Sequence, residues 1–167
     1  MSDIIQLLEE MRASSGDAVT IGLPNNVILD FAKRDSNIVM AIEEGHSKQS
    51  EFNSEHLMMH ETDLISHLQE DFVNFYSPAT VNPYVAISAR GPWVVTSHGA
   101  VLHDNGGYGM LGGGHGPSEI IDVMSENHVM ANVMTASFSQ ARLAEALKKE
   151  LGHTRGSCPF SKFICMN

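Results

Sequence analysis

The sequence predicts a mixed α/β protein, with an α+β arrangement over these 167 residues. Three observations predict it. Apolar residues recur at helical spacing over residues 1–78, short β-prone runs and glycines fill residues 79–117, and helical patterns return over residues 118–167 before a last apolar run. We therefore expect a helical N-terminal region, a β-meander with a glycine-rich loop, and an α/β segment.

The N-terminal region opens with an amphipathic helix whose apolar positions are Ile4, Ile5, Leu7, Leu8 and Met11. Two shorter helical patterns cover residues 27–33 and 37–44. A long helix is predicted over residues 54–76, and Pro78 ends it. Its apolar side is made of Leu57, Met58, Leu64, Ile65, Leu68, Phe72 and Phe75.

The middle region contains three β-rich runs, at residues 85–88, 93–96 and 100–103. The turn-forming segments Arg90-Gly-Pro and Ser97-His-Gly separate them. Runs of this length with such short connections favour a small antiparallel meander.

The last region begins with a helix opened by Pro117, Ser118 and Glu119. A second helix is predicted over residues 140–151, with Ser139 as its N-cap and Gly152 as its stop. Residues 160–166 then predict an apolar strand that runs to the end of the sequence. Since a buried strand normally leads into a loop, we expect this chain to be the front portion of a larger enzyme.

Composition excludes some classes of protein. Lys and Arg total 10 against 20 Asp and Glu, a formal net charge of −10, which argues against nucleic acid or an anionic membrane as a partner. The sequence contains no apolar run long enough to span a membrane and no secretory signal pattern. Two cysteines are too few for a disulfide framework, so we expect a cytoplasmic protein with reduced thiols.

The glycine-rich stretch at residues 106–116, GGYGMLGGGHG, is the main candidate site. It contains a G-x-G-x-x-G pattern at Gly107, Gly109 and Gly112. A dinucleotide fingerprint must open a helix directly, and this pattern does not. Two readings stay open: turns that need positive φ, or close approach of the backbone to a ligand or a neighbouring subunit. His115 is either a ligand contact or a structural residue of the turn.

Two further constellations are weaker. His56 and His60 lie four residues apart and could present both imidazoles to a metal, but Leu57 stands where a zinc protease has glutamate. Cys158 and Cys165 have no second pair for a zinc site, and a catalytic Cys158 would need a base such as His153.

Three segments in order carry a resemblance to a known family. Residues 101–108, VLHDNGGY, resemble a strand-turn "x-x-x-D-x-x-G-x-x-Y", and residues 114–121, GHGPSEII, resemble "G-H-x-H-P-x-V". Residues 163–167, FICMN, resemble the strand before "S-G-S/T-E-A". Residues 82–167 thus resemble the front of a class III aminotransferase, a fold-type I enzyme that uses pyridoxal phosphate. The shortened segment between Tyr108 and Gly114 leaves the substrate class open.

The resemblance implies that residues 118–167 begin the large cofactor-binding domain, with residues 160–166 as the first strand of its parallel sheet. It implies a homodimer that moves an amino group between an amino donor and a 2-oxo acid or aldehyde. Tyr108, Gly112 and Gly113 would contact the substrate, and Asn167 would lead into the loop that holds the cofactor phosphate. The Schiff-base lysine and the aspartate on the pyridine nitrogen come later in the family, so this chain alone would be inactive.

Two other hypotheses remain. The chain could be a freestanding domain that binds a small molecule or a protein through loop 106–116, which requires Phe163, Ile164 and Met166 to be covered within it. It could also be a metal-dependent enzyme that uses His56 and His60.

Overall fold

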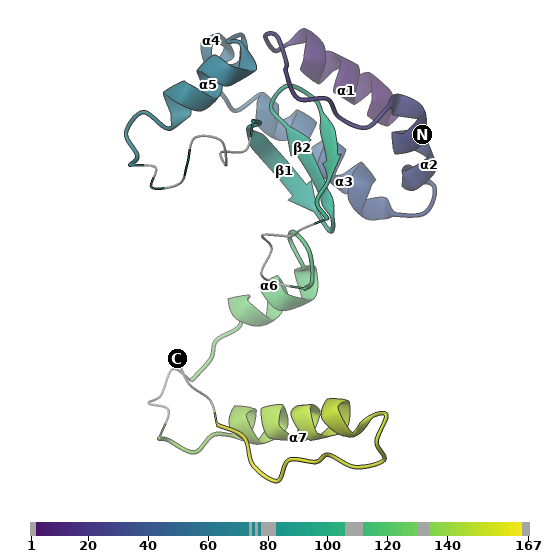
Figure 1. Ribbon diagram of the computed structural model, residues 1–167, viewed down its shortest axis with the longest axis vertical. Helices are drawn as coiled ribbons and strands as arrows, with labels where there is room; N and C mark the ends of the chain where they lie inside the picture. The colour runs from purple at the N-terminus through teal and green to yellow at the C-terminus, as the bar shows by residue number, and fades with distance from the viewer. Residues whose placement is uncertain are drawn as a thin grey trace. The chain divides into compact units, whose positions relative to one another are not determined.

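The computed structural model describes residues 3–73, 75, 77, 83–105, 112–129 and 134–164. The chain has a mixed α+β fold and divides into two units, Met1–Ser125 and Glu126–Asn167 (Figure 1). The first unit contains α1 (Asp3–Ala13), α2 (Asn25–Ala32), α3 (Ser36–Gln49), α4 (Ser54–Leu57), α5 (Glu61–Leu68), β1 (Ala86–Arg90), β2 (Trp93–Thr96), β3 (Val101–His103) and α6 (Ser118–Ser125). The second contains α7 (Phe138–Gly152). No helix among these residues has the length and apolar character needed to cross a bilayer.

The three strands form an antiparallel sheet in the order β1-β2-β3, which confirms the predicted meander. Val94 on the central strand pairs with Ala89 on one side and Leu102 on the other. The register of β1 shifts between Ala86 and Ser88, where the strand is irregular.

Helix α3 packs across β1 and β2, and α1 and α2 pack against α3 (Figure 1). This arrangement buries one face of the sheet. The buried cluster consists of Ile4, Leu8, Met11, Ile28, Ile38, Ala41, Ile42, Trp93, Val95 and Val101. Each fully buried aliphatic side chain contributes about 1.5–3 kcal/mol, so this cluster fixes the position of the sheet on its helices.

Asp35 joins the sheet to α3. One carboxylate oxygen accepts from the backbone N–H of Asn37 at 2.9 Å as the N-cap of α3, and the other accepts from Trp93 Nε1 at 2.7 Å. The hydrogen bond from the Trp93 indole is the largest cause that lowers the pKa of Asp35, and the bond from Asn37 adds to it. One side chain thus sets both the start of the helix and the orientation of the buried indole.

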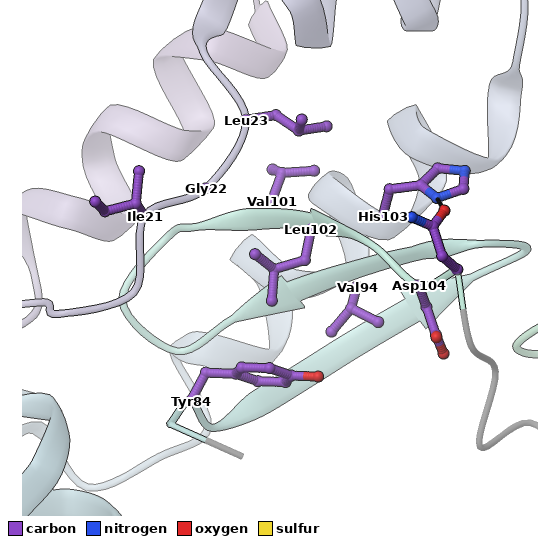
Figure 2. Close-up of a pocket in the computed structure, with 10 residues that line it drawn as sticks. Ile21, Gly22, Leu23, Tyr84, Val94, Val101, Leu102, His103 and Asp104 are labelled. Atoms are coloured by element: carbon purple, nitrogen blue, oxygen red, sulfur yellow. Dashed lines mark hydrogen bonds between the residues drawn. The ribbon is translucent and has the colours of Figure 1, made fainter.

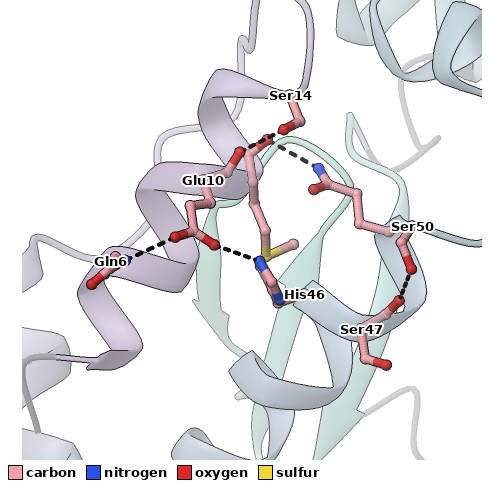
Figure 3. A network of polar contacts seen from close by, with 8 residues as sticks. Gln6, Glu10, Ser14, His46, Ser47 and Ser50 are labelled. Atoms are coloured by element: carbon pink, nitrogen blue, oxygen red, sulfur yellow. Dashed lines mark hydrogen bonds and ion pairs between the residues drawn. The ribbon is translucent and has the colours of Figure 1, made fainter.

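Polar contacts join α1 to α3 beside the core (Figure 3). Gln49 is buried, and its Nε2 donates to the carbonyls of Met11 at 3.0 Å and Ser97 at 2.9 Å. At the surface, His46 Nε2 lies 2.8 Å from Glu10 Oε2. Hydrogen bonds from Gln6 and His46 lower the pKa of the Glu10 carboxyl.

The long helix predicted over residues 54–76 is wrong, because two short helices stand in its place. Asn53 caps α4, and His60, with an extended backbone, caps α5. Glu61 is fully buried, and its Oε2 accepts from the backbone N–H groups of Val19 and Thr20 at 2.8 and 2.7 Å. This non-local anchor fixes the start of α5. Helix α5 ends at Leu68, so Phe72 and Phe75 lie beyond it, 77% and 82% exposed.

The predicted helix of the second unit is confirmed, although its N-cap is Ser137 rather than Ser139. The predicted stop at Gly152 is wrong, because Gly152 is still helical and His153 is the C-cap. Ser137 Oγ accepts from the backbone N–H of Gln140 at 3.3 Å. The predicted strand at residues 160–166 is not formed over its described part, residues 160–164, which are irregular. Leu143, Leu151, Phe160 and Ile164 are exposed, whereas Ala144, Leu147 and Phe163 are half-buried. Among the described residues of this unit, the apolar side of α7 is therefore only partly covered.

Candidate functional site

The candidate site lies where the turn at residues 112–117 meets the hairpin between β1 and β2. The backbone N–H of Gly91 donates to the carbonyl of His115, and the N–H of His115 donates to the carbonyl of Gly91, both at 2.8 Å. This two-bond bridge holds the turn against the hairpin tip across 24 residues of sequence.

Gly114 and Gly116 have a structural reason to be glycine. Their φ angles are +75° and +58°, in the region that side chains other than glycine rarely adopt. A Cβ on Gly114 would lie 2.8 Å from the carbonyl oxygen of Gly91, and one on Gly116 would lie 2.8 Å from Arg90 Nη1. At these two positions the predicted need for positive φ and close backbone approach is therefore met.

The side chain of His115 is held by Asp104, which follows β3. Nε2 of His115 lies 2.9 Å from Oδ2 of Asp104, and the two side chains are 33% and 24% exposed. Because a carboxylate only accepts, Nε2 carries the proton that it donates to Asp104. His115 thus has a defined structural role in the turn, one of the two roles that the sequence left open.

Arg90 adds a second connection to the same turn. Its Nε donates to Glu44 Oε2 at 2.9 Å, and its Nη1 donates to the carbonyl of Gly116 at 3.3 Å. Glu44 also pairs with Lys48 at 2.6 Å. Hydrogen bonds from Lys48 and then Arg90 lower the pKa of Glu44, so this carboxylate is negative at neutral pH.

The substrate-contact residues predicted from the resemblance divide in two groups. Gly112 and Gly113 are exposed residues of the turn. No described atom lies within 4 Å of a Cβ built on Gly112, whereas one on Gly113 would meet Pro117 at 3.4 Å. Tyr108 and Asn167 lie outside the described residues, as do Gly107 and Gly109 of the G-x-G-x-x-G pattern.

A groove of about 460 Å³ lies on β3 and the segment before α2, and Asp104, the partner of His115, is one of its lining residues. Figure 2 shows Tyr84, Val94 and Leu102 projecting toward a common space, with the carboxylate of Asp104 near one end. The other lining residues are Ile21, Gly22, Leu23, Val101, His103 and Asn105. The groove is open to solvent, and its lining combines apolar side chains with the polar groups of His103, Asp104 and Asn105.

The two histidines of the metal hypothesis do not lie on one helix. His56 belongs to α4 and packs its ring on that of His67 at 4.5 Å, while His60 caps α5. Within the described ranges, no group of three or more His, Cys, Asp or Glu side chains could hold a metal ion. This finding removes the reason to read His56 and His60 as one helical metal site.

Among the described residues, the hydrogen bonds of Cys158 are with Phe160 and not with a base such as His153. Cys158 Sγ donates to the carbonyl of Phe160 at 3.4 Å, a local contact within a turn. Cys165 lies outside the described residues.

Residues that build the site but were not predicted as site residues are Glu44, Arg90 and Asp104. Asp104 lies in the segment VLHDNGGY, which carries part of the resemblance, and its spacing to His115 across a glycine-rich loop was the signal that could have identified it. Arg90 and Glu44 lie 46 residues apart, and no local pattern connects them.

Comparisons with known protein families, with curated proteins and with solved structures find no match to this chain.

Proposed function

We propose that this chain is the N-terminal part of a class III aminotransferase that uses pyridoxal phosphate. The intact protein would move an amino group between an amino donor and a 2-oxo acid or aldehyde. One observation supports the proposal most. Asp104 and His115 belong to separate motif segments of the resemblance, and their side chains meet at 2.9 Å beside the same hairpin.

The exposed glycines of the turn support a role in binding. Gly114 and Gly116 are explained by backbone conformation, but Gly112 has neither a positive φ nor a described neighbour that excludes a side chain. A glycine with open space around it suits close approach of a ligand to the backbone. We assign Gly112 and Gly113, together with Tyr108, to the substrate side of the site.

The second unit fits the start of a cofactor-binding domain in the proposed enzyme. Its apolar residues Phe160 and Ile164 are 54% and 84% exposed in an irregular segment. Exposed apolar residues in a β-prone run are suited to a strand that pairs with later strands of a parallel sheet, since such strands are buried on both faces. We propose that residues 160–166 adopt that strand in the intact homodimer.

The described residues do not form a cradle for pyridoxal phosphate. Lys33 is paired with Asp30 and Lys48 with Glu44, each within one turn of helix. Asn167, assigned to the approach to the phosphate loop, lies outside the described residues. Bound cofactor would supply the electron sink for amino transfer.

A freestanding binding domain is the second candidate, because the groove is lined by Asp104 and Asn105, which directly precede loop 106–116 in the sequence. That hypothesis requires Phe163, Ile164 and Met166 to be covered within the chain. Phe163 is half-buried and Met166 lies outside the described residues, while the 84% exposure of Ile164 argues against the hypothesis. Size-exclusion chromatography separates the two. We expect the isolated chain to self-associate through its exposed apolar residues. A stable monomer of 18.2 kDa would favour the freestanding domain.

The coding sequence that follows the Asn167 codon tests the family assignment. The proposal expects a continuation of the Ser-Gly-Ser/Thr-Glu-Ala type, followed further on by the Schiff-base lysine. A stop codon, or a continuation without that motif, would contradict it.

A further inference from the structure

Arg90 connects α3 to the turn at residues 112–117. Its guanidinium bonds to two partners that are distant in sequence, Glu44 on α3 at 2.9 Å and the carbonyl of Gly116 at 3.3 Å. The side chains of Arg90 and Glu44 are 30% and 28% exposed, so both are partly shielded from water. Such shielding strengthens a charge-assisted hydrogen bond.

This guanidinium also contacts the backbone of the turn. A Cβ on Gly116 would lie 2.8 Å from Arg90 Nη1, so the arginine packs directly on the backbone of the turn. Two residues earlier, Gly114 packs on the Gly91 carbonyl. With the middle and the end of the turn fixed in this way, Gly112 and Gly113 are its exposed part.

We propose that Arg90, held by Glu44, is a positioning residue that presents the backbone of Gly112 and Gly113 to the substrate. The inference rests on the proposed function and adds to it a residue that does not itself touch the substrate. An arginine is required because its planar guanidinium donates in two fixed directions, whereas the ammonium of lysine is a single point charge. Arg90→Lys therefore keeps the charge and loses one of the two connections.

The first test uses amide hydrogen exchange of the 167-residue chain, read at the N–H of His115, which donates to the Gly91 carbonyl. We expect faster exchange in Arg90→Lys and in Glu44→Gln. The matched control is Arg34→Lys, because Arg34 is exposed and its side-chain contacts with described residues are local, to the Asp30 carbonyl and the Phe31 ring. Exchange at His115 that is unchanged in Arg90→Lys, or equally raised in the control, overturns the inference.

The second test uses the protein made from the complete open reading frame. Arg90→Lys should raise KM for the amino donor by about tenfold, with little change in kcat or in bound pyridoxal phosphate, because misplaced substrate contacts weaken binding. An unchanged KM, or a loss of activity that parallels a loss of cofactor, overturns the inference while leaving the proposed function intact. A wild-type protein without amino transfer overturns both.

Discussion

Asp104 Oδ2 lies 2.9 Å from His115 Nε2, and this contact joins the end of β3 to the turn before α6. We expect His115→Gln and Asp104→Asn each to lower the free energy of unfolding by about 0.5–1.5 kcal/mol, the usual net value of one hydrogen bond. Urea denaturation measures both variants. Asp122→Asn on the exposed surface of α6 is the control and should change stability little.

The double variant shows whether the two side chains act as a pair. If they do, combining Asp104→Asn with His115→Gln costs less than the sum of the single changes, because the interaction can be lost only once. Strictly additive effects would contradict the pairing.

The glycines of the turn should respond differently to alanine. Gly114→Ala introduces a Cβ 2.8 Å from the Gly91 carbonyl at a φ of +75°, so we expect a loss of about 1–3 kcal/mol. Gly112→Ala meets no described atom within 4 Å and should change stability by less than about 0.5 kcal/mol. Thermal melting of the two variants makes the comparison. Equal losses would mean that the turn is arranged differently.

Glu44 should make the fold sensitive to acid. The folded state lowers its pKa through Lys48 and Arg90, so its contribution is present above the ordinary carboxyl pKa of about 4.3 and is lost as the pH falls through the lower, folded value. Glu44→Gln should therefore cost about 0.5–1 kcal/mol at pH 7, and this difference should shrink as the pH falls below about 4. Denaturation at several pH values checks it, and a difference that grows on acidification would refute the assignment.

Glu61 should be among the most sensitive positions of the helical region. Its buried Oε2 accepts from two backbone N–H groups, while Oε1 has no partner within the described part of the chain. Glu61→Ala leaves both donors without an acceptor, and we expect a loss of about 2–4 kcal/mol. Glu61→Gln keeps an acceptor oxygen and should lose less. Chemical denaturation would reject this role if the two variants were equally stable.

Periodicity in the sequence predicted the elements whose pattern is local. The helical spacing of Ile4, Leu8 and Met11 and the β-rich runs around Trp93 and Val101 all correspond to observed elements. The break between α4 and α5 was missed, because it depends on hydrogen bonds from Val19 and Thr20 to Glu61, some 40 residues away. A helical pattern of apolar residues carries no information about such a contact.

The site was predictable to a similar extent. Glycine density pointed to the turn, where Gly114 and Gly116 have the positive φ that the sequence suggested. The partners of the turn, Arg90 and Glu44, come from β1 and α3 and meet only because the helix packs on the sheet. Spacing along the chain gives no sign of that meeting.

The central claim is that this chain is part of a pyridoxal-phosphate aminotransferase, and the cofactor content of the protein made from the complete open reading frame tests it most directly. We expect close to one pyridoxal phosphate per chain, released on denaturation, and amino transfer from a donor to a 2-oxo acid or aldehyde. A well-folded product that binds no pyridoxal phosphate would contradict the account.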